Sequence, residues 1–344
     1  MEQTKRVLLI GGAGTLGSYT ATELLMAGYR VDCIDSSERT SYNRNLTYIR
    51  AAADDTLLRE LFSRHHYDCV VDFIHYPDWQ SYPARGELLL QNTDQLIFLS
   101  SYRVYADRQH PVTEEAPQLL QALDDPVFLS RESYAVPKSH IENWLRGSGY
   151  RNWTIVRPVI SFSHYRFDLV TQNSRVMLPR ILQHKRVLLP DCCRDKAAGL
   201  CWAGDTGKMI AALCCNEKAL GEAFTLGTGE NLTWGEIADL YTEIAGLKFE
   251  WIDMETYLSV ATNHNYMDRC ILLYDRVWDR IIDNSKVLAA TGLRRDDFTG
   301  IRKGLIREFQ FMMDRPDLYA RTDTESDRAV NDRIDRYLAE NGIQ

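Results

Sequence analysis

The stretch that decides the fold is Val7–Gly17, which reads Val-Leu-Leu-Ile-Gly-Gly-Ala-Gly-Thr-Leu-Gly. It opens with an apolar run, as in a buried strand, and a helical pattern over residues 16–26 follows the glycines. A turn without side chains lets backbone N–H groups approach a pyrophosphate, and the N-terminus of the following helix adds partial positive charge. The residues expected to contact a pyrophosphate are Gly11, Gly14, Thr15, Leu16 and Gly17.

The second predicted strand, residues 30–34, leads into an acidic residue. Asp35 follows the glycine turn by about 20 residues, a spacing at which a carboxylate accepts hydrogen bonds from the ribose hydroxyls of adenosine. The same negative charge would repel a 2′-phosphate, so the sequence favours NAD over NADP as cofactor. The alternative is that Asp35 simply begins a polar loop.

Short apolar runs alternate with helical patterns through the first half of the chain. This rhythm predicts an α/β fold with a doubly wound, parallel sheet of the Rossmann type. Predicted strands are 6–10, 30–34, 47–49, 69–74, 95–99 and 153–156, and predicted helices are 16–26, 55–64, 83–90 and 134–146. Later in the chain the alternation weakens, which indicates a second, smaller α/β lobe.

The pattern also predicts how the chain divides. We expect a dinucleotide-binding domain over residues 1–165 and a substrate-binding lobe over residues 166–314. A helical pattern at about 205–215 is expected to return to the first domain. Residues 315–344 read as a charged C-terminal tail, within which 328–339 has the pattern of an amphipathic surface helix.

Composition excludes several classes of protein. The chain has 344 residues and a formal net charge of −8, with 45% hydrophobic and 26% charged residues. A disordered chain and a strongly basic nucleic-acid binder do not fit these values. Apolar runs such as Leu96–Leu99 fall far short of the ~20 residues that cross a bilayer, and the first residues lack the apolar region of a secretory signal. We therefore expect a cytoplasmic protein without a membrane partner.

Cysteine and histidine spacing gives no support for a metal site. Eight cysteines lack any Cys-x-x-Cys pair, and eight histidines lack a His-Glu-x-x-His pattern. We expect reduced, mostly buried thiols and no bound metal.

A tyrosine and a lysine, Tyr134 and Lys138, lie four residues apart and share one face of a predicted helix. An adjacent ammonium stabilises phenolate and lowers the tyrosine pKa from its usual value of about 10. Tyr134 could then exchange a proton with a substrate hydroxyl while hydride moves to or from a nicotinamide. The alternative is an exposed tyrosine–lysine pair. If Ser133 caps the helix, Pro137 falls near its start, where proline costs little.

A third candidate follows the predicted strand 95–99. Ser101 lies at the carboxyl edge of this strand, where ligands bind in open α/β sheets. Its hydroxyl could hydrogen-bond the reacting oxygen and orient it toward Tyr134. Serines at strand ends are otherwise common turn formers.

Taken in order along the chain, these motifs resemble the extended short-chain dehydrogenase/reductases, and among them the NAD-dependent epimerase/dehydratase family. The resemblance covers roughly residues 5–310. It is carried by the glycine turn, Asp35, Ser100-Ser101-x-x-Val104-Tyr105, Tyr134-x-x-x-Lys138, Arg157-Pro158, Trp202–Asp205 and Phe224–Gly229.

The resemblance implies roles for individual residues. Ser101, Tyr134 and Lys138 correspond to the catalytic triad of the family. In family epimerases a sugar hydroxyl is oxidised to a transient ketone, and the same bound NAD returns the hydride. Further cofactor contacts implied by the resemblance are Asp54 at the adenine, and Arg157 and Pro158 at the nicotinamide. Tyr134 and Lys138 of the triad are also expected to contact the cofactor.

The sequence departs from the family pattern at the end of the fourth strand, where Asp72–His75 replaces a His-Leu-Ala-Ala type run. Bulk at Ile74 and His75 would narrow the cofactor cleft, or His75 would contact substrate. A packed neutral histidine is the alternative. Similar Asp-Phe-Ile strands occur in relatives of the chloroplast stem-loop binding protein, for which RNA contact has been proposed. Tyr102 and Arg103 replace the Asp-Glu pair of the dehydratases, which disfavours water elimination.

The leading hypothesis is an NAD-dependent epimerase or oxidoreductase that acts on a hydroxyl of a nucleotide-activated sugar. The alternatives are a simple alcohol dehydrogenase or ketone reductase, and a non-catalytic NAD- or RNA-binding protein. A net charge of −8 argues against nucleic acid as a partner. A homodimer through helix 134–146 stays open, because its apolar residues could instead face the sheet. The candidate substrate contacts are His75, Tyr102, Arg103 and Arg194.

Overall fold

The computed structural model describes residues 4–315 and 324–343, which fall into two compact units. The first unit comprises the residues up to Ser161 together with Ala203–Thr228 and Asp283–Phe298, and the second comprises Phe162–Trp202, Gly229–Ile282 and the residues from Thr299 onward. The segment expected to return at about 205–215 lies within Ala203–Thr228. A second returning segment, Asp283–Phe298, had no counterpart in the expected boundaries.

The first unit contains a seven-stranded parallel sheet of order β10-β6-β5-β4-β1-β2-β3. Its strands are β1 (Arg6–Ile10), β2 (Arg30–Asp35), β3 (Leu46–Arg50), β4 (Cys69–Asp72), β5 (Leu96–Leu99), β6 (Trp153–Pro158) and β10 (Glu222–Leu226). The six predicted strands and the Rossmann-type fold are confirmed, whereas β10 was not among the predictions. β4 ends at Asp72, two residues early, because the Asp72 carboxylate accepts the N–H of Ile74 and turns the chain.

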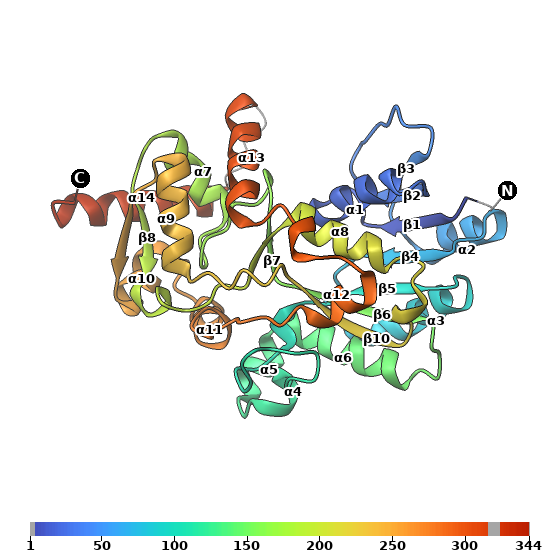
Figure 1. Cartoon of the computed structure of the whole chain (residues 1–344). Coiled ribbons are helices and arrows are strands. Elements are labelled where there is room, and N and C mark those ends of the chain that lie inside the picture. The colour runs from blue at the N-terminus through green and yellow to red at the C-terminus, as the bar shows by residue number, and fades with distance from the viewer. Residues whose placement is uncertain (1–3, 316–323, 344) are drawn as a thin grey trace. The chain divides into compact units, whose positions relative to one another are not determined.

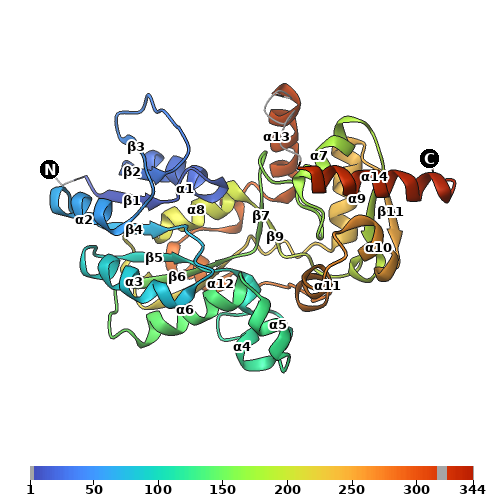
Figure 2. The ribbon, with the colours of Figure 1, turned by 180° about the vertical axis from the view of Figure 1, so that it is seen from behind.

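Helices cover both faces of this sheet (Figures 1 and 2). They are α1 (Thr15–Met26), α2 (Asp55–Arg64), α3 (Tyr82–Gln91), α6 (Ala135–Gly147), α8 (Ala203–Leu213) and α12 (Ser285–Thr291), with short helical segments η1 (Trp79–Ser81), η2 (Tyr102–Val104), α4 (Leu119–Ala122), α5 (Pro126–Arg131), η4 (Glu217–Ala219) and η6 (Arg295–Asp297). On one face α1 packs closely on α8. The missing side chain of Gly207 permits this approach, since a Cβ there would lie 2.8 Å from the backbone nitrogen of Thr20.

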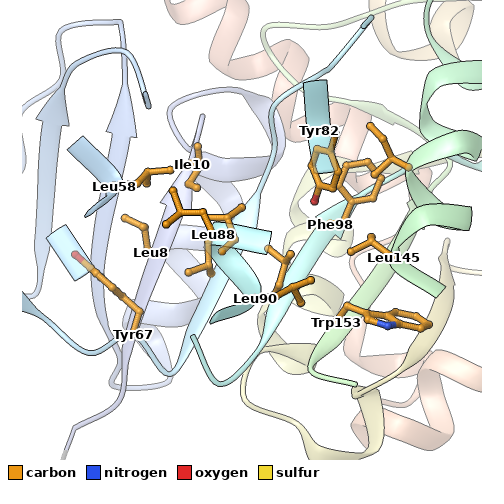
Figure 3. Packing of buried hydrophobic residues seen from close by; sticks show 14 of the residues in the cluster. Leu8, Ile10, Leu58, Tyr67, Tyr82, Leu88, Leu90, Phe98, Leu145 and Trp153 are labelled. Carbon is orange, nitrogen blue, oxygen red and sulfur yellow. The ribbon is translucent and has the colours of Figure 1, made fainter. Parts of the chain in front are cut away.

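The opposite face carries the hydrophobic core shown in Figure 3. Its helical members come from α2, α3 and α6, and they pack on strand residues such as Leu8 and Phe98. Ile141 and Leu145 of α6 belong to this cluster. These apolar residues of α6 therefore face the sheet, which is the arrangement weighed above against a dimer through this helix.

The strand order places a topological switch point between β1 and β4. From β1 the chain builds β2 and β3 on one side, and then β4, β5, β6 and β10 on the other. Ile10 and Asp72, the last residues of β1 and β4, are register partners. Ligands of open α/β sheets bind outside the carboxyl ends of the strands at such a point.

The second unit is built from helices around a small parallel pair, β8 (Val187–Pro190) and β11 (Phe249–Ile252). Its helices are α7 (Ser174–Leu182), α9 (Trp234–Ala245), α10 (Met254–Ala261), α11 (Tyr266–Ile271), α13 (Ile301–Asp314) and α14 (Glu325–Glu340), with the short segments η3 (Asp191–Cys193) and η5 (Leu272–Arg276). The other strands in the described part of the chain are β7 (Ile160–Phe162) and β9 (Leu200–Trp202).

The C-terminal helix α14 confirms the helical pattern predicted for 328–339. Val330, Ile334 and Leu338 are buried, and α14 packs on α7 and α10. Of the expected charged tail, residues 316–323 and 344 lie outside the described residues.

The cysteines are free thiols, and all are buried except Cys192, which is exposed, and Cys215, which is half-buried. Across the described ranges, no helix combines the length and the apolar character that crossing a bilayer requires.

Candidate functional site

The glycine turn follows β1 at the switch point, and its positions require glycine for different structural reasons. Gly11 has φ +73°, which favours glycine. A Cβ at Gly12 would lie 2.6 Å from Cβ of Leu9, and a Cβ at Gly17 would collide with the Gly12 backbone. Gly14 is different, because it is exposed and a Cβ there would meet only the Gly11 carbonyl oxygen, at 3.8 Å. The open surface at Gly14, just before α1, fits the close approach of a dinucleotide pyrophosphate.

Asp35, at the end of β2, is tied to the glycine turn. Its Oδ2 accepts the N–H of Ala13 at 3.1 Å, and its Oδ1 accepts the N–H and the hydroxyl of Ser37 at 2.9 and 2.7 Å. Partial burial raises the pKa of Asp35, but the hydrogen bonds from Ser37 and Ala13 outweigh it, so the net pKa lies below its usual value. The side chain is therefore a fixed carboxylate beside the turn.

Asp54 has a local partner of its own. It is exposed and caps α2, its Oδ1 accepting the N–H of Leu57 at 2.9 Å. A second carboxylate oxygen and an exposed position are compatible with the expected adenine contact.

Lys138 lies on the first turns of α6 and reaches the carboxyl end of β5. Its Nζ donates to the carbonyl oxygens of Leu99 at 2.5 Å and Ser100 at 3.2 Å, and it lies 5.1 Å from the centre of the Tyr134 ring. Burial lowers the pKa of Lys138, while Tyr134, Asp72 and Glu142 act in the opposite direction. Fixed carbonyl acceptors thus hold the ammonium beside the phenol.

The start of α6 differs from the expectation. Ser133 does not cap the helix; instead Oε2 of the buried Glu132 accepts the N–H groups of Tyr134, Ala135 and Val136 at 2.9, 2.6 and 2.9 Å. Pro137 lies in the first turn of α6, where its missing N–H costs no helical hydrogen bond. Glu132 was missed by the sequence reasoning, although an acidic residue just before a helix is a recognised start signal.

Ser101 lies at the carboxyl edge of β5, as expected, and is buried. It precedes η2, and its Oγ accepts the N–H of Arg103 at 3.2 Å. Arg103 in turn reaches Tyr134, with its guanidinium carbon 5.1 Å from the ring centre, and pairs with Glu132 at 3.4 Å.

His75 lies on the loop after β4, exposed, with its ring centre 5.2 Å from that of Tyr134. Partial burial and the nearby Lys138 lower the pKa of His75, so the ring is neutral near pH 7. Lys138, Arg103 and His75 thus surround the Tyr134 ring.

The departure at Asp72–His75 has a structural basis. The Asp72 carboxylate is buried and accepts the Ile74 N–H at 3.0 Å and the Tyr76 hydroxyl at 2.8 Å. Burial raises the pKa of Asp72 to about 6. Ile74 lies against the glycine turn, with its Cδ1 3.0 Å from the position a Cβ at Gly11 would occupy. The bulk expected beside the cofactor turn is therefore present.

Arg157, which the family resemblance placed at the nicotinamide, is fully buried. Its guanidinium is buried and pairs with Glu142, the closest approach being 2.5 Å, and donates to the Tyr105 hydroxyl at 2.7 Å. Ser100 donates to the same carboxylate at 2.5 Å. The side chain ties β6 to α6. Pro158 ends β6 and is buried opposite Leu226.

The two other substrate candidates, Tyr102 and Arg194, lie in different units. Tyr102 is 2% exposed, which leaves its ring little accessible surface. Arg194 belongs to the second unit, where its guanidinium carbon lies 5.5 Å from the ring centre of Trp251.

The structure brings one set of possible metal ligands together in the described part of the chain. His66, Asp68 and Asp94 offer ligand atoms within 4.8 Å of one another. They precede β4 and β5, at the opposite edge of the sheet from the glycine turn, and His66 already pairs with Asp94 at 2.9 Å.

The sequence matches the model of the NAD dependent epimerase/dehydratase family over residues 7–195. A search of curated proteins finds no match.

Solved structures share the fold. An epimerase from Methanothermobacter thermautotrophicus has a TM-score of 0.69 at 16% identity, over 93% of this chain and 95% of that one. The dTDP-glucose 4,6-dehydratase of Bacillus anthracis, solved with NAD, has a TM-score of 0.68 at 16% identity, over 91% of this chain and 98% of that one. The UDP-glucose 4-epimerase of Thermotoga maritima, solved with UDP-glucose, has a TM-score of 0.65 at 19% identity, over 90% of this chain and 99% of that one. Because the family model matches more than half of its length, the chain belongs to the NAD dependent epimerase/dehydratase family.

Proposed function

We propose that this protein is an NAD-dependent epimerase or oxidoreductase that acts on a hydroxyl of a nucleotide-activated sugar. The observation that carries the proposal is the placement of the Lys138 ammonium, 5.1 Å from the Tyr134 ring centre and anchored on carbonyls at the carboxyl end of β5. This is the edge of the sheet at which the glycine turn also lies. The cation favours the ionised phenol, which is the form that can accept a proton.

In the proposed mechanism, Tyr134 removes the proton from the substrate hydroxyl as hydride leaves the carbon atom that bears this hydroxyl. Ser101 hydrogen-bonds the reacting oxygen and orients it toward Tyr134, and Lys138 stabilises the phenolate. Bound NAD supplies the hydride acceptor. When the direction reverses, Tyr134 returns the proton to the oxygen, so an epimerase needs no net oxidant.

The cofactor-binding residues are assigned from the turn outward. Backbone N–H groups of Gly14, Thr15 and Leu16 at the start of α1 would bind the pyrophosphate, with Gly11 and Gly17 shaping the turn. Asp35 would bind the adenosine ribose and Asp54 the adenine. The fixed Asp35 carboxylate supports NAD over NADP. Pro158, at the end of β6, would lie at the nicotinamide end.

Substrate recognition is the finer part of the proposal. His75 and Arg103 lie around Tyr134 and would contact the sugar. The substrate contacts of Tyr102 and Arg194 stay predictions from the sequence. Dehydratase chemistry has less support, because Tyr102 and Arg103 offer no carboxylate for water elimination. The fold does not decide this point, since a dehydratase is among the similar structures.

The test is an assay of the purified protein with NAD and a panel of UDP- and dTDP-hexoses. An epimerase changes the sugar configuration, seen in the NMR signals of the ring protons, without accumulating NADH. A simple dehydrogenase forms NADH in proportion to product, which is the outcome that favours the alternative. Failure to bind NAD and to convert any hexose would contradict the proposal.

A further inference from the structure

Glu132 connects the two segments that hold the Tyr134 phenol. Its side chain is 3% exposed, and Oε2 accepts three consecutive N–H groups at the start of α6, including that of Tyr134 itself. Its other oxygen, Oε1, faces the Arg103 guanidinium at 3.4 Å. One buried carboxylate therefore fixes the backbone of Tyr134 and the side chain of Arg103 at the same time.

Arg103 adds a second positive charge to the one that the Tyr-x-x-x-Lys pattern provides. Its guanidinium carbon and the Nζ of Lys138 both lie 5.1 Å from the Tyr134 ring centre. Arg103 is 19% exposed, so water screens its charge less than that of a surface arginine. It stands two residues after Ser101, in the short helical turn that Ser101 begins.

We propose that Arg103 is a positioning residue, held by Glu132, whose charge stabilises the ionised form of the Tyr134 phenol together with Lys138. This inference rests on the proposed acid–base function of Tyr134. The charge of the guanidinium acts through the phenol, in addition to the proposed contact of Arg103 with the sugar. Two positive charges, those of Lys138 and Arg103, then act on this tyrosine.

The other charged groups around Tyr134 must be weighed. Lys138 lies on the same helix, α6, and Arg103 on η2. His75, on the loop after β4, is neutral near pH 7, because partial burial and Lys138 lower its pKa. Glu132 opposes the cations, but three backbone N–H groups also share its charge.

The test measures the ionisation midpoint of Tyr134 directly. Tyrosine isotopically labelled at Cζ is incorporated into the full chain, NAD is added, and the NMR signal lost in Tyr134→Phe identifies the residue. The signal is followed against pH in the unchanged protein, in Arg103→Gln, in Arg103→Lys and in Arg64→Gln. Arg64 is the matched control, an exposed arginine of α2 paired with Glu60.

Arg103→Gln is expected to raise the midpoint by roughly one pH unit, the lower end of the effect of a charge at this distance. Arg103→Lys keeps the charge and should restore most of the shift, and Arg64→Gln should leave the midpoint unchanged. An unchanged midpoint in folded Arg103→Gln would overturn the inference, as would equal shifts in the Gln and Lys variants. If the midpoint shifts as expected but Tyr134→Phe converts nucleotide sugars at the full rate, the proposed function fails and the electrostatic role of Arg103 stands.

Discussion

The Arg157 guanidinium lies 2.5 Å from the Glu142 carboxylate, and the two side chains are 1% and 0% exposed. Burial alone would raise the pKa of Glu142, but Arg157 and the hydroxyl of Ser100 bring it below its usual value. This pair joins β6 to α6, the helix that begins directly after Tyr134 and carries Lys138. The pair therefore connects the sheet to the helix of the candidate site.

Removing one member of this pair should strongly destabilise the first unit. Glu142→Ala leaves a buried, uncompensated guanidinium, and we expect the free energy of unfolding to fall by about 3–5 kcal/mol. Urea unfolding followed by circular dichroism measures the change. The surface pair Arg64–Glu60 is the control, and Glu60→Ala should cost about 0–1 kcal/mol. Equal stability of Glu142→Ala and the unchanged protein would show that the pair does not hold α6.

Asp72 should make stability depend on pH in the mildly acidic range. Its pKa is raised to about 6 in the folded protein, above the value of an unfolded aspartate, so the folded state binds the proton more tightly. Stability should therefore fall as pH rises from about 4 to 6, by on the order of 2–3 kcal/mol. Asp72→Asn should remove this dependence.

The measurement for Asp72 is denaturant unfolding of both proteins at a series of pH values. Both proteins share all their other titratable groups, so the difference between the two curves isolates Asp72. Parallel curves would mean that Asp72 does not titrate in this range.

Gly14 and Gly12 should separate cofactor binding from folding. Gly14→Ala adds a methyl group in open surroundings and should change the free energy of unfolding by less than about 1 kcal/mol. In the proposed binding mode the same methyl group would lie where the pyrophosphate approaches, so NAD affinity should fall at least about tenfold. Gly12→Ala should instead destabilise the fold, because its Cβ would lie 2.6 Å from Cβ of Leu9. Calorimetric titration with NAD and thermal unfolding distinguish the two effects, and undiminished NAD affinity in Gly14→Ala would argue against this binding surface.

Asp35 should set the preference between the two nicotinamide dinucleotides. Asp35→Asn keeps a hydrogen-bond acceptor for Ala13 and removes the charge that repels a 2′-phosphate, so the ratio of NADP to NAD affinity should rise by about tenfold or more. Asp54→Asn is the comparison, since Asp54 is exposed on α2 and is proposed to contact only adenine. The Kd values of both dinucleotides give the answer. A ratio that stays constant in Asp35→Asn would reassign the ribose contact.

Local sequence signals predicted the strands of the sheet. The apolar run before Gly11 and the acidic residue after β2 depend on residues close in sequence, and the structure places Asp35 against the turn as expected for such a unit. The spacing of Tyr134 and Lys138 likewise follows from helix geometry. Such features need no knowledge of the rest of the chain.

Contacts between distant segments could not be predicted in the same way. Glu132 meets Arg103, and Arg157 meets Glu142, only once β5, β6 and α6 have assembled. The resemblance to a family placed Arg157 at the nicotinamide, whereas its partner on α6 decides where the guanidinium points. The contact of Ile74 with Gly11 arises from the neighbouring positions of β4 and β1 in the sheet.

The most direct measurement of the central claim is the rate of hydride transfer in Tyr134→Phe, with Tyr42→Phe as a control at a fully exposed tyrosine. With NAD and the nucleotide hexose that the unchanged protein converts fastest, we predict at least about a hundredfold loss in Tyr134→Phe and no loss in Tyr42→Phe. A Tyr134→Phe protein that binds NAD and transfers hydride at the unchanged rate would contradict the account.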